Sequence, residues 1–157
     1  IPESLEEIKS TWMDMARDKY TNKVPLKPGA REFLVWLRQQ GIRTGIASSN
    51  GIELVETVLK AQGIQEYLES VHTCCEVPKG KPAPDIYLLV AETLGVKPEE
   101  CLVFEDVPMG ILAGKNAGMR VCAVEDTFSA AQREEKKELA DYYIESYDEI
   151  PRERMQP

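Results

Sequence analysis

Short apolar segments alternate with helical segments along this 157-residue chain, and this alternation constrains the fold more than any other feature. Strand-like runs are expected at residues 42–47, 71–77, 101–105, 120–124 and 142–146. Helical spacing is expected at residues 30–40, 52–62 and 84–94, and in a further segment that ends at residue 117. Strands that alternate with such helices form parallel sheets covered on both faces. The sequence therefore predicts an α/β fold with a Rossmann-like parallel sheet and helices on both faces.

A further helix is expected at the beginning of the chain. Ser4 and Glu7 form a capping-box pattern, and the helix is expected to continue to about Tyr20. Its apolar residues recur at helical spacing and are Leu5, Ile8, Trp12 and Met15. We interpret Trp12 and Met15, together with Trp36 of the next helix, as core residues. The prolines and glycine of "NKVPLKPG" then indicate a connector.

Charge and cysteine usage exclude several classes of partner. The formal net charge is −8, which argues against nucleic acid because phosphate backbones are bound by clustered Lys and Arg. The chain has no apolar run of the roughly 20 residues that a membrane-spanning helix needs, and no signal-peptide pattern opens it. The cysteines form no Cys-x-x-Cys pair and are Cys74, Cys75, Cys101 and Cys122. This pattern indicates reduced, buried cysteines in a cytoplasmic protein. We separately expect the protein to be a monomer.

Polar residues follow the strand at residues 42–47. Ser48, Ser49 and Asn50 stand where a parallel strand ends, and such ends are where α/β sheets bind ligands. Hydroxyl groups and free N–H groups at a helix start suit a phosphate group. Ser and Asn are also the favoured N-caps of helices. Phosphate binding and helix capping therefore both remain open here.

A lysine follows the next strand. Lys81 lies between Gly80 and Pro82, so its backbone is stiffly placed just before a helix. An ammonium group in that place offers a point charge to a phosphoryl oxygen. The alternative is a solvated surface lysine, and Lys79 is a nearby competitor for the same role.

Two adjacent acids, Glu105 and Asp106, follow the apolar strand "CLVF". Oxygen ligands on a strand end suit Mg²⁺, which takes one or two carboxylates and a substrate phosphate. Capping of the following helix is the alternative for Asp106. Capping does not explain Glu105, because burying a carboxylate without a partner is costly. Taken together, the three strand ends predict a site for a phosphate and a cation.

The sequence resembles the haloacid dehalogenase (HAD) superfamily, and most of all its β-phosphoglucomutases and small sugar-phosphate phosphatases. "GIRTGIASSN" resembles the second motif of the family, which ends in Ser48. "KGKPAPDIY" resembles the third motif and maps onto Lys81. "VFEDVPMGILAGKNAGM" resembles the fourth motif, with its metal ligands at Glu105 and Asp106. The resemblance covers nearly the whole chain.

The first motif of the family, Asp-x-Asp-x-Thr or Val after an apolar strand, has no counterpart here. "MDMARD" places Asp14 and Asp18 in a helical segment without a preceding strand, so we reject it. The resemblance identifies residues 1–22 as the last helix of a helical cap domain. It identifies residues 23–157 as the core without its first strand, which in the family lies between the strands of the second and fourth motifs.

The resemblance implies Mg²⁺-dependent phosphoryl transfer through an aspartyl-phosphate on a small phosphorylated metabolite, such as a sugar phosphate. Asp106, helped by Glu105, would hold Mg²⁺. Ser48, with Ser49 or Asn50, would bind a phosphoryl oxygen, and Lys81 would neutralise charge. The resemblance implies that the nucleophile lies outside this chain, so the 157 residues alone are expected to be inactive, or to act in association with their missing N-terminal segment.

Three other functions are alternatives. The first is a mutase of the β-phosphoglucomutase type, and the second is a non-catalytic phosphate-binding remnant. The third is a CheY-like receiver, which is disfavoured because Ser48 stands where a receiver carries an aspartate. The mixed charges of residues 133–143 are interpreted as a solvated helix face.

Overall fold

Five strands form two parallel sheets in this computed structural model, which describes residues 4–153. Residues 1–3, part of the expected cap segment, and residues 154–157 lie outside the described residues. The strands are β1 (Gly45–Ser48), β2 (Ser70–Thr73), β3 (Leu102–Glu105), β4 (Arg120–Val124) and β5 (Tyr142–Ile144). β1 pairs with β2, and β4 lies between β3 and β5; every pairing is parallel. The prediction of an α/β fold with parallel sheets is therefore confirmed.

Helices connect these strands as the sequence pattern indicated. They are α1 (Leu5–Asn22), α2 (Ala30–Gln39), α3 (Ile52–Gln62), α4 (Asp85–Leu94), α5 (Pro108–Asn116) and α6 (Arg133–Leu139). Gly63 and Gly95 end α3 and α4 in the left-handed conformation, with φ of 65° and 68°, which favours glycine. Within residues 4–153, no helix is both long and apolar enough to cross a bilayer.

Four of the five strands are shorter than the sequence predicted, and β1 and β2 differ most. The expected strand at 42–47 begins only at Gly45, because the N–H of Ile42 donates to the carbonyl of Leu37 and so closes α2. The expected strand at 71–77 ends at Thr73, where Thr73 and Glu76 form a capping box that turns the chain. The cysteine prediction was partly wrong, since all four thiols are free but Cys75 is exposed.

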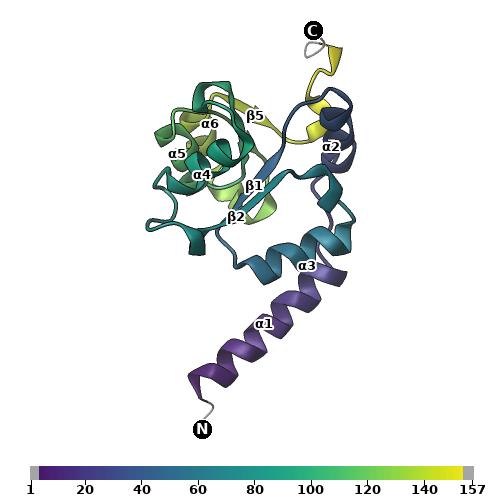
Figure 1. Cartoon of the computed structure of the whole chain (residues 1–157), viewed down its shortest axis with the longest axis vertical. Coiled ribbons are helices and arrows are strands. Elements are labelled where there is room, and N and C mark those ends of the chain that lie inside the picture. The colour runs from purple at the N-terminus through teal and green to yellow at the C-terminus, as the bar shows by residue number, and fades with distance from the viewer. Residues whose placement is uncertain (1–3, 154–157) are drawn as a thin grey trace.

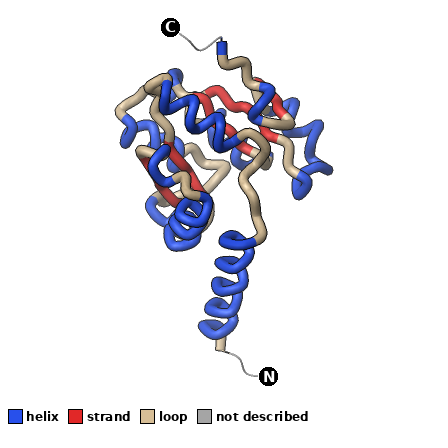
Figure 2. The backbone as a smooth tube through the Cα atoms, turned by 90° about the vertical axis from the view of Figure 1, so that its right-hand side faces the viewer, coloured by secondary structure: helices blue, strands red, loops and turns tan. Residues whose placement is uncertain are grey.

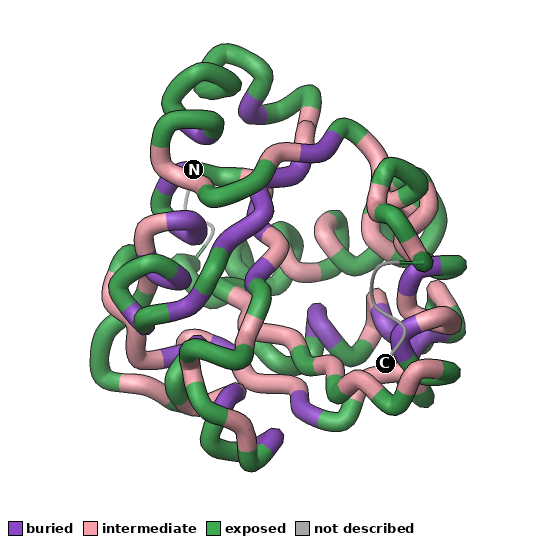
Figure 3. Tube along the Cα trace, turned by 90° about the horizontal axis from the view of Figure 1, so that it is seen from above, coloured by how far each residue is buried: buried purple, intermediate pink, exposed green. Residues whose placement is uncertain are grey.

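Alternate residues of the strands face two different layers of helices. Ala47 and Val103 contact the cluster that includes Ile111 of α5. The next residue along β1, Ile46, packs instead with Val55 of α3 and its neighbours. Because side chains of a strand alternate between its faces, helices cover both faces of the sheets. Figure 3 shows the buried segments running through the interior, with exposed helical segments around them.

The two sheets are separated by a cavity. β1 pairs only with β2, and β3 pairs only with β4, so each has one edge without a strand neighbour within residues 4–153. Figure 2 shows the strands as two separate groups. The space between them, about 910 Å³, is lined by residues of both β1 and β3 and by helices α2 and α4.

Helix α1 projects away from the sheets (Figure 1) and contacts α3. The expected capping box at Ser4 is present, and the helix continues to Asn22. The interpretation of Trp12 and Met15 as core residues is wrong, because each is 59% exposed. The apolar face that the sequence predicted is therefore present, but within residues 4–153 nothing covers it.

The packing of α5 on β3 and β4 yields a stability prediction. A Cβ added at Gly114 would lie 2.7 Å from Cγ2 of Val121, a fully buried and stiff side chain. We expect Gly114→Ala to lower the free energy of unfolding by about 1–3 kcal/mol through overpacking, as measured by urea denaturation. Gly51→Ala is the control, since a Cβ there meets no atom within 4 Å. Equal urea midpoints for the two variants would contradict the packing described.

Candidate functional site

Ser48 ends β1 and faces a turn, not a helix start. Its Oγ accepts a hydrogen bond from the N–H of Asn50 at 3.1 Å. The N-cap of α3 is Gly51, without a side-chain hydrogen bond, so the capping alternative for these polar residues is wrong. The hydroxyl of Ser48 and the loop that follows it are therefore left for another role.

Lys81 is largely buried, with only 12% of its side chain exposed. Its Nζ donates to the carbonyl oxygen of Ala47 at 3.1 Å and to the carboxylate of Glu105. It also lies 5.0 Å from the centre of the Tyr87 ring, within the range of a cation–π contact. The alternative of a solvated lysine is wrong for Lys81.

Glu105 is buried, and two protein groups compensate its charge. Oε1 accepts from the ammonium of Lys81 and from the hydroxyl of Tyr87. The carboxylate lies so close to α5 that a Cβ on Gly110 would come within 2.1 Å of it. Burial, together with the neighbouring Glu105 charge, raises the pKa of Tyr87 well above its usual value. The hydroxyl of Tyr87 therefore stays protonated and donates a hydrogen bond to Glu105.

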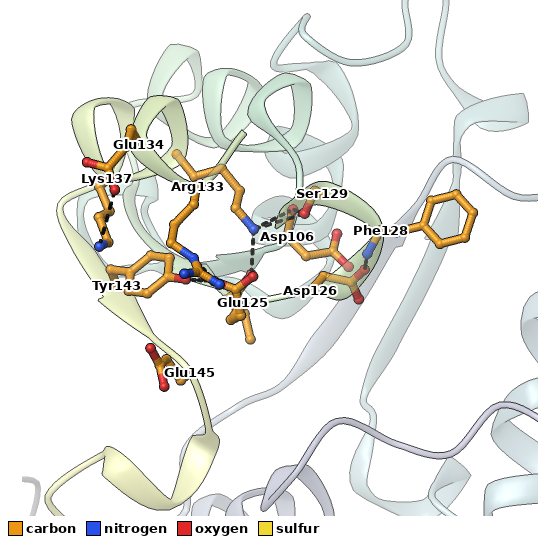
Figure 4. A network of polar contacts seen from close by, with 12 residues as sticks. Asp106, Glu125, Asp126, Phe128, Ser129, Arg133, Glu134, Lys137, Tyr143 and Glu145 are labelled. Carbon is orange, nitrogen blue, oxygen red and sulfur yellow. Dashed lines mark hydrogen bonds and ion pairs between the residues drawn. The ribbon is translucent and has the colours of Figure 1, made fainter. Parts of the chain in front are cut away.

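Asp106 is more exposed than Glu105 and faces a different lysine. The N-cap of α5 is Val107, with no side-chain hydrogen bond, so the capping alternative for Asp106 is wrong. Oδ2 of Asp106 lies 3.4 Å from Nζ of Lys27, which is 2.5 Å from Oδ2 of Asp126. The hydrogen bond from Lys27 is the main cause that lowers the pKa of Asp126. Figure 4 shows the two aspartates beside each other.

The cavity between β1 and β3 joins these groups. Among the residues that line it are Ser48, Ser49, Lys81, Glu105 and Asp106. These come from the carboxyl ends of both sheets and from the loop after β2. Asn50, the sixth predicted site residue, is exposed and is not part of the lining. The arrangement offers a hydroxyl, an ammonium group and a partly exposed carboxylate to one ligand.

Sequence reasoning missed Lys27 and Tyr87, which also line the cavity. Lys27 directly precedes Pro28, just as Lys81 precedes Pro82, so the same argument from a stiff backbone applied to it. Tyr87 stands in an apolar run of helix α4 and offered no signal beyond its helical spacing.

Comparisons with known proteins agree with this architecture. A family model described as haloacid dehalogenase-like hydrolase matches residues 3–118. Hexitol phosphatase B of Escherichia coli (strain K12) is 33% identical over 126 residues, which cover 80% of this chain and 56% of that protein. Phosphorylated carbohydrates phosphatase of Thermotoga maritima is 33% identical over 119 residues, covering 76% of this chain and 55% of that protein.

Solved structures show the same fold. A mutant of CbbY from Rhodobacter sphaeroides, in complex with xylulose-(1,5)bisphosphate, superposes with a TM-score of 0.84 at 25% identity. The match covers 96% of this chain and 67% of that one. The chain spans about half the length of the curated relatives it matches. Since the family model covers most of the chain, this protein belongs to the haloacid dehalogenase-like hydrolase family.

Proposed function

We propose that the protein to which this chain belongs hydrolyses phosphate esters of small metabolites, and of sugars in particular. The observation that carries the proposal is the meeting of Ser48, Lys81 and Asp106 around one cavity at the carboxyl ends of β1 and β3. The names of the relatives support the substrate class, since they describe phosphatases of hexitols and of phosphorylated carbohydrates.

The proposed reaction has two displacements at phosphorus. A carboxylate oxygen of an aspartate outside this chain attacks phosphorus, and the bond from phosphorus to the ester oxygen breaks. The alcohol leaves with a proton from a general acid. Water then attacks the phosphorus of the aspartyl-phosphate, releasing inorganic phosphate and restoring the carboxylate. In both steps the groups of this chain position the phosphoryl oxygens and balance their charge.

Ser48 and Lys81 are the groups assigned to the phosphoryl oxygens. The hydroxyl of Ser48 donates to one of them, with Ser49 and Asn50 of the same loop as assisting donors. The ammonium of Lys81 lies against another oxygen and offsets the negative charge of the transferring group. Glu105 holds Lys81 in place through a hydrogen bond to its ammonium group.

Mg²⁺ fits the oxygen donors of this site. Asp106 and Asp126 already share one cationic group, the ammonium of Lys27. Within the described residues no three Asp, Glu, His or Cys side chains are grouped to hold a metal by themselves. We therefore assign Asp106 as the ligand from this chain, with Glu105 acting through Lys81, and the remaining ligands coming from water, the substrate and the outside aspartate. When bound, Mg²⁺ neutralises charge on the phosphoryl group.

The cavity between the sheets indicates where the proposed nucleophile outside this chain could lie. It is bordered by the free edges of β1 and β3 and covered by helices on both sides. We propose that an apolar parallel strand from another part of the same protein fills it, with the aspartate at its carboxyl end near Ser48 and Asp106. The uncovered apolar face of α1 supports the assignment of residues 1–22 as the last helix of a cap domain, and of residues 23–157 as the core.

Lys81 and its neighbour Lys79 offer a matched test in the complete protein. Lys81→Ala and Asp106→Asn are each expected to lower kcat for a hexitol phosphate with Mg²⁺ by about 10²–10³-fold or more, because each removes charge stabilisation. Lys79→Ala is the control and should keep the wild-type rate. Normal kcat values for both site variants, measured by phosphate release, would refute the site assignment.

The dependence on an outside nucleophile is tested by comparing two proteins of different length. An intact mass measurement first identifies the 17.7 kDa chain and any longer species in one preparation. We expect the 17.7 kDa chain alone to release no phosphate, and the longer protein to be active until EDTA is added. Mg²⁺-dependent turnover by the short chain would show that the nucleophile lies within it.

The contact between Tyr87 and Glu105 predicts a pH dependence of stability. Because the pKa of Tyr87 is raised in the folded protein, its contribution is complete below about pH 10 and is lost as the pH rises further. We expect Tyr87→Phe to lose about 1.5–3 kcal/mol at pH 7, since the hydrogen bond to a charged group is removed. We also expect its urea midpoint to fall less steeply above pH 10. Tyr142→Phe is the control, because Tyr142 is exposed. A urea midpoint of Tyr87→Phe that falls above pH 10 as steeply as that of the wild type would contradict the prediction.

A further inference from the structure

Lys136 is a fully buried lysine in a helix that the sequence indicated to be solvated. The interpretation of residues 133–143 as a solvated face is therefore wrong at this position, where the side chain is 0% exposed. The neighbouring Lys137 lies at the surface, 3.6 Å from Glu134. Because burying an ammonium group is costly, its hydrogen bonds must compensate it.

The ammonium of Lys136 makes three hydrogen bonds, and two of them are to the ends of strands. It donates to Oγ of Ser129 at 2.9 Å, and to the backbone carbonyls of Val124 and Asp106 at 3.2 Å each. Val124 is the last residue of β4, and Asp106 directly follows β3. Among the described residues no carboxylate lies within 4.0 Å of this ammonium. Its direct compensation therefore comes from hydroxyl and carbonyl dipoles at the site, and the carboxylates of Glu125 and Asp126 add a longer-range attraction.

Ser129 completes a closed set of contacts around the backbone of Asp106. Its hydroxyl donates to the Asp106 carbonyl at 2.6 Å and accepts from Lys136. Ser129 is itself only 4% exposed, and Figure 4 shows it beside Asp106. The carbonyl of Asp106 is thus bound by two buried donors, while its carboxylate faces Lys27 on the side of the cavity. The backbone carbonyl and the side-chain carboxylate of Asp106 are therefore held by different groups.

We propose that Lys136, with Ser129, is a positioning residue that fixes the backbone of Asp106 so that its carboxylate is aimed at the cation of the site. This inference rests on the proposed function for the identity of that cation. A purely structural lysine would need only to satisfy buried carbonyls. Lys136 instead links the end of β3, beside Asp106, to the end of β4. Its loss is therefore expected to change the orientation of the Asp106 carboxylate and to leave the contacts with the substrate unchanged.

Manganese binding to the complete protein tests this role without relying on turnover. Mn²⁺ affinity is measured by electron paramagnetic resonance, together with kcat and KM for a hexitol phosphate. We expect Lys136→Met to weaken Mn²⁺ binding and to lower kcat by about 10–100-fold, the range found when residues that orient metal ligands are removed. KM should change little, because Lys136 is not placed at the substrate. Lys137→Met is the matched control and should behave as the wild type.

Two results would overturn the proposal. One is a folded Lys136→Met protein with wild-type Mn²⁺ affinity. If that variant does not fold, Ser129→Ala decides, because it removes the hydroxyl between Lys136 and Asp106 and leaves the ammonium in place; the proposal expects about tenfold weaker Mn²⁺ binding, and unchanged affinity refutes it. A wild type that binds Mn²⁺ but hydrolyses no phosphate ester would refute the proposed function alone, since the comparison of affinities would still decide the role of Lys136.

Discussion

The buried contact between Lys81 and Glu105 is the interaction on which the site depends. The carboxylate stands at the end of β3, and the ammonium also donates to the carbonyl of Ala47 in β1. One side chain therefore connects two strands that no backbone pairing joins. A buried ion pair has a strict geometry, because each partner left alone would be an uncompensated charge. The contact therefore links β1 to β3 and fixes the position of the Lys81 ammonium group at the carboxyl ends of these strands.

The cavity separates two kinds of surface. Along its length it is lined by apolar residues of β1, β3 and the helices on either side. The groups of the candidate site lie at the carboxyl ends of the strands, and Arg43, Thr44 and Glu100 line the opposite end. Free strand edges offer unpaired N–H and C=O groups, which are costly to leave without partners. An extended apolar segment in the cavity would pack against its apolar walls and form hydrogen bonds with the free edges of β1 and β3. The last residue of that segment would then lie near the carboxyl ends of these strands. The feature that leaves the two sheets unpaired is thus also the place that we propose for the nucleophile.

The sequence predicted the candidate site residues at strand ends and in the loops that follow them, and it missed those that other elements bring to the cavity. Glu105 could be placed because an apolar strand runs directly into it. Tyr87 contacts Glu105 across 18 residues of chain, Lys136 contacts Asp106 across 30, and Lys27 contacts Asp126 across 99. Periodicity describes which face of an element is apolar, not which distant element it meets. The same limit explains the error at Trp12, whose apolar stripe is real but uncovered.

The lysines of the site also limit what the net charge can say about the substrate. A charge of −8 argues against a polyanion that spreads over the surface, since it would meet the acidic side chains everywhere. A small phosphate ester meets only the local charges, because salt screens the others beyond about 8 Å. Around the strand ends those local charges are the ammonium groups of Lys27 and Lys81, together with the carboxylates of Glu105, Asp106 and Asp126 that pair with them. An acidic protein can therefore bind a small anion where its fold brings lysines from two separate loops to the same end of the sheets.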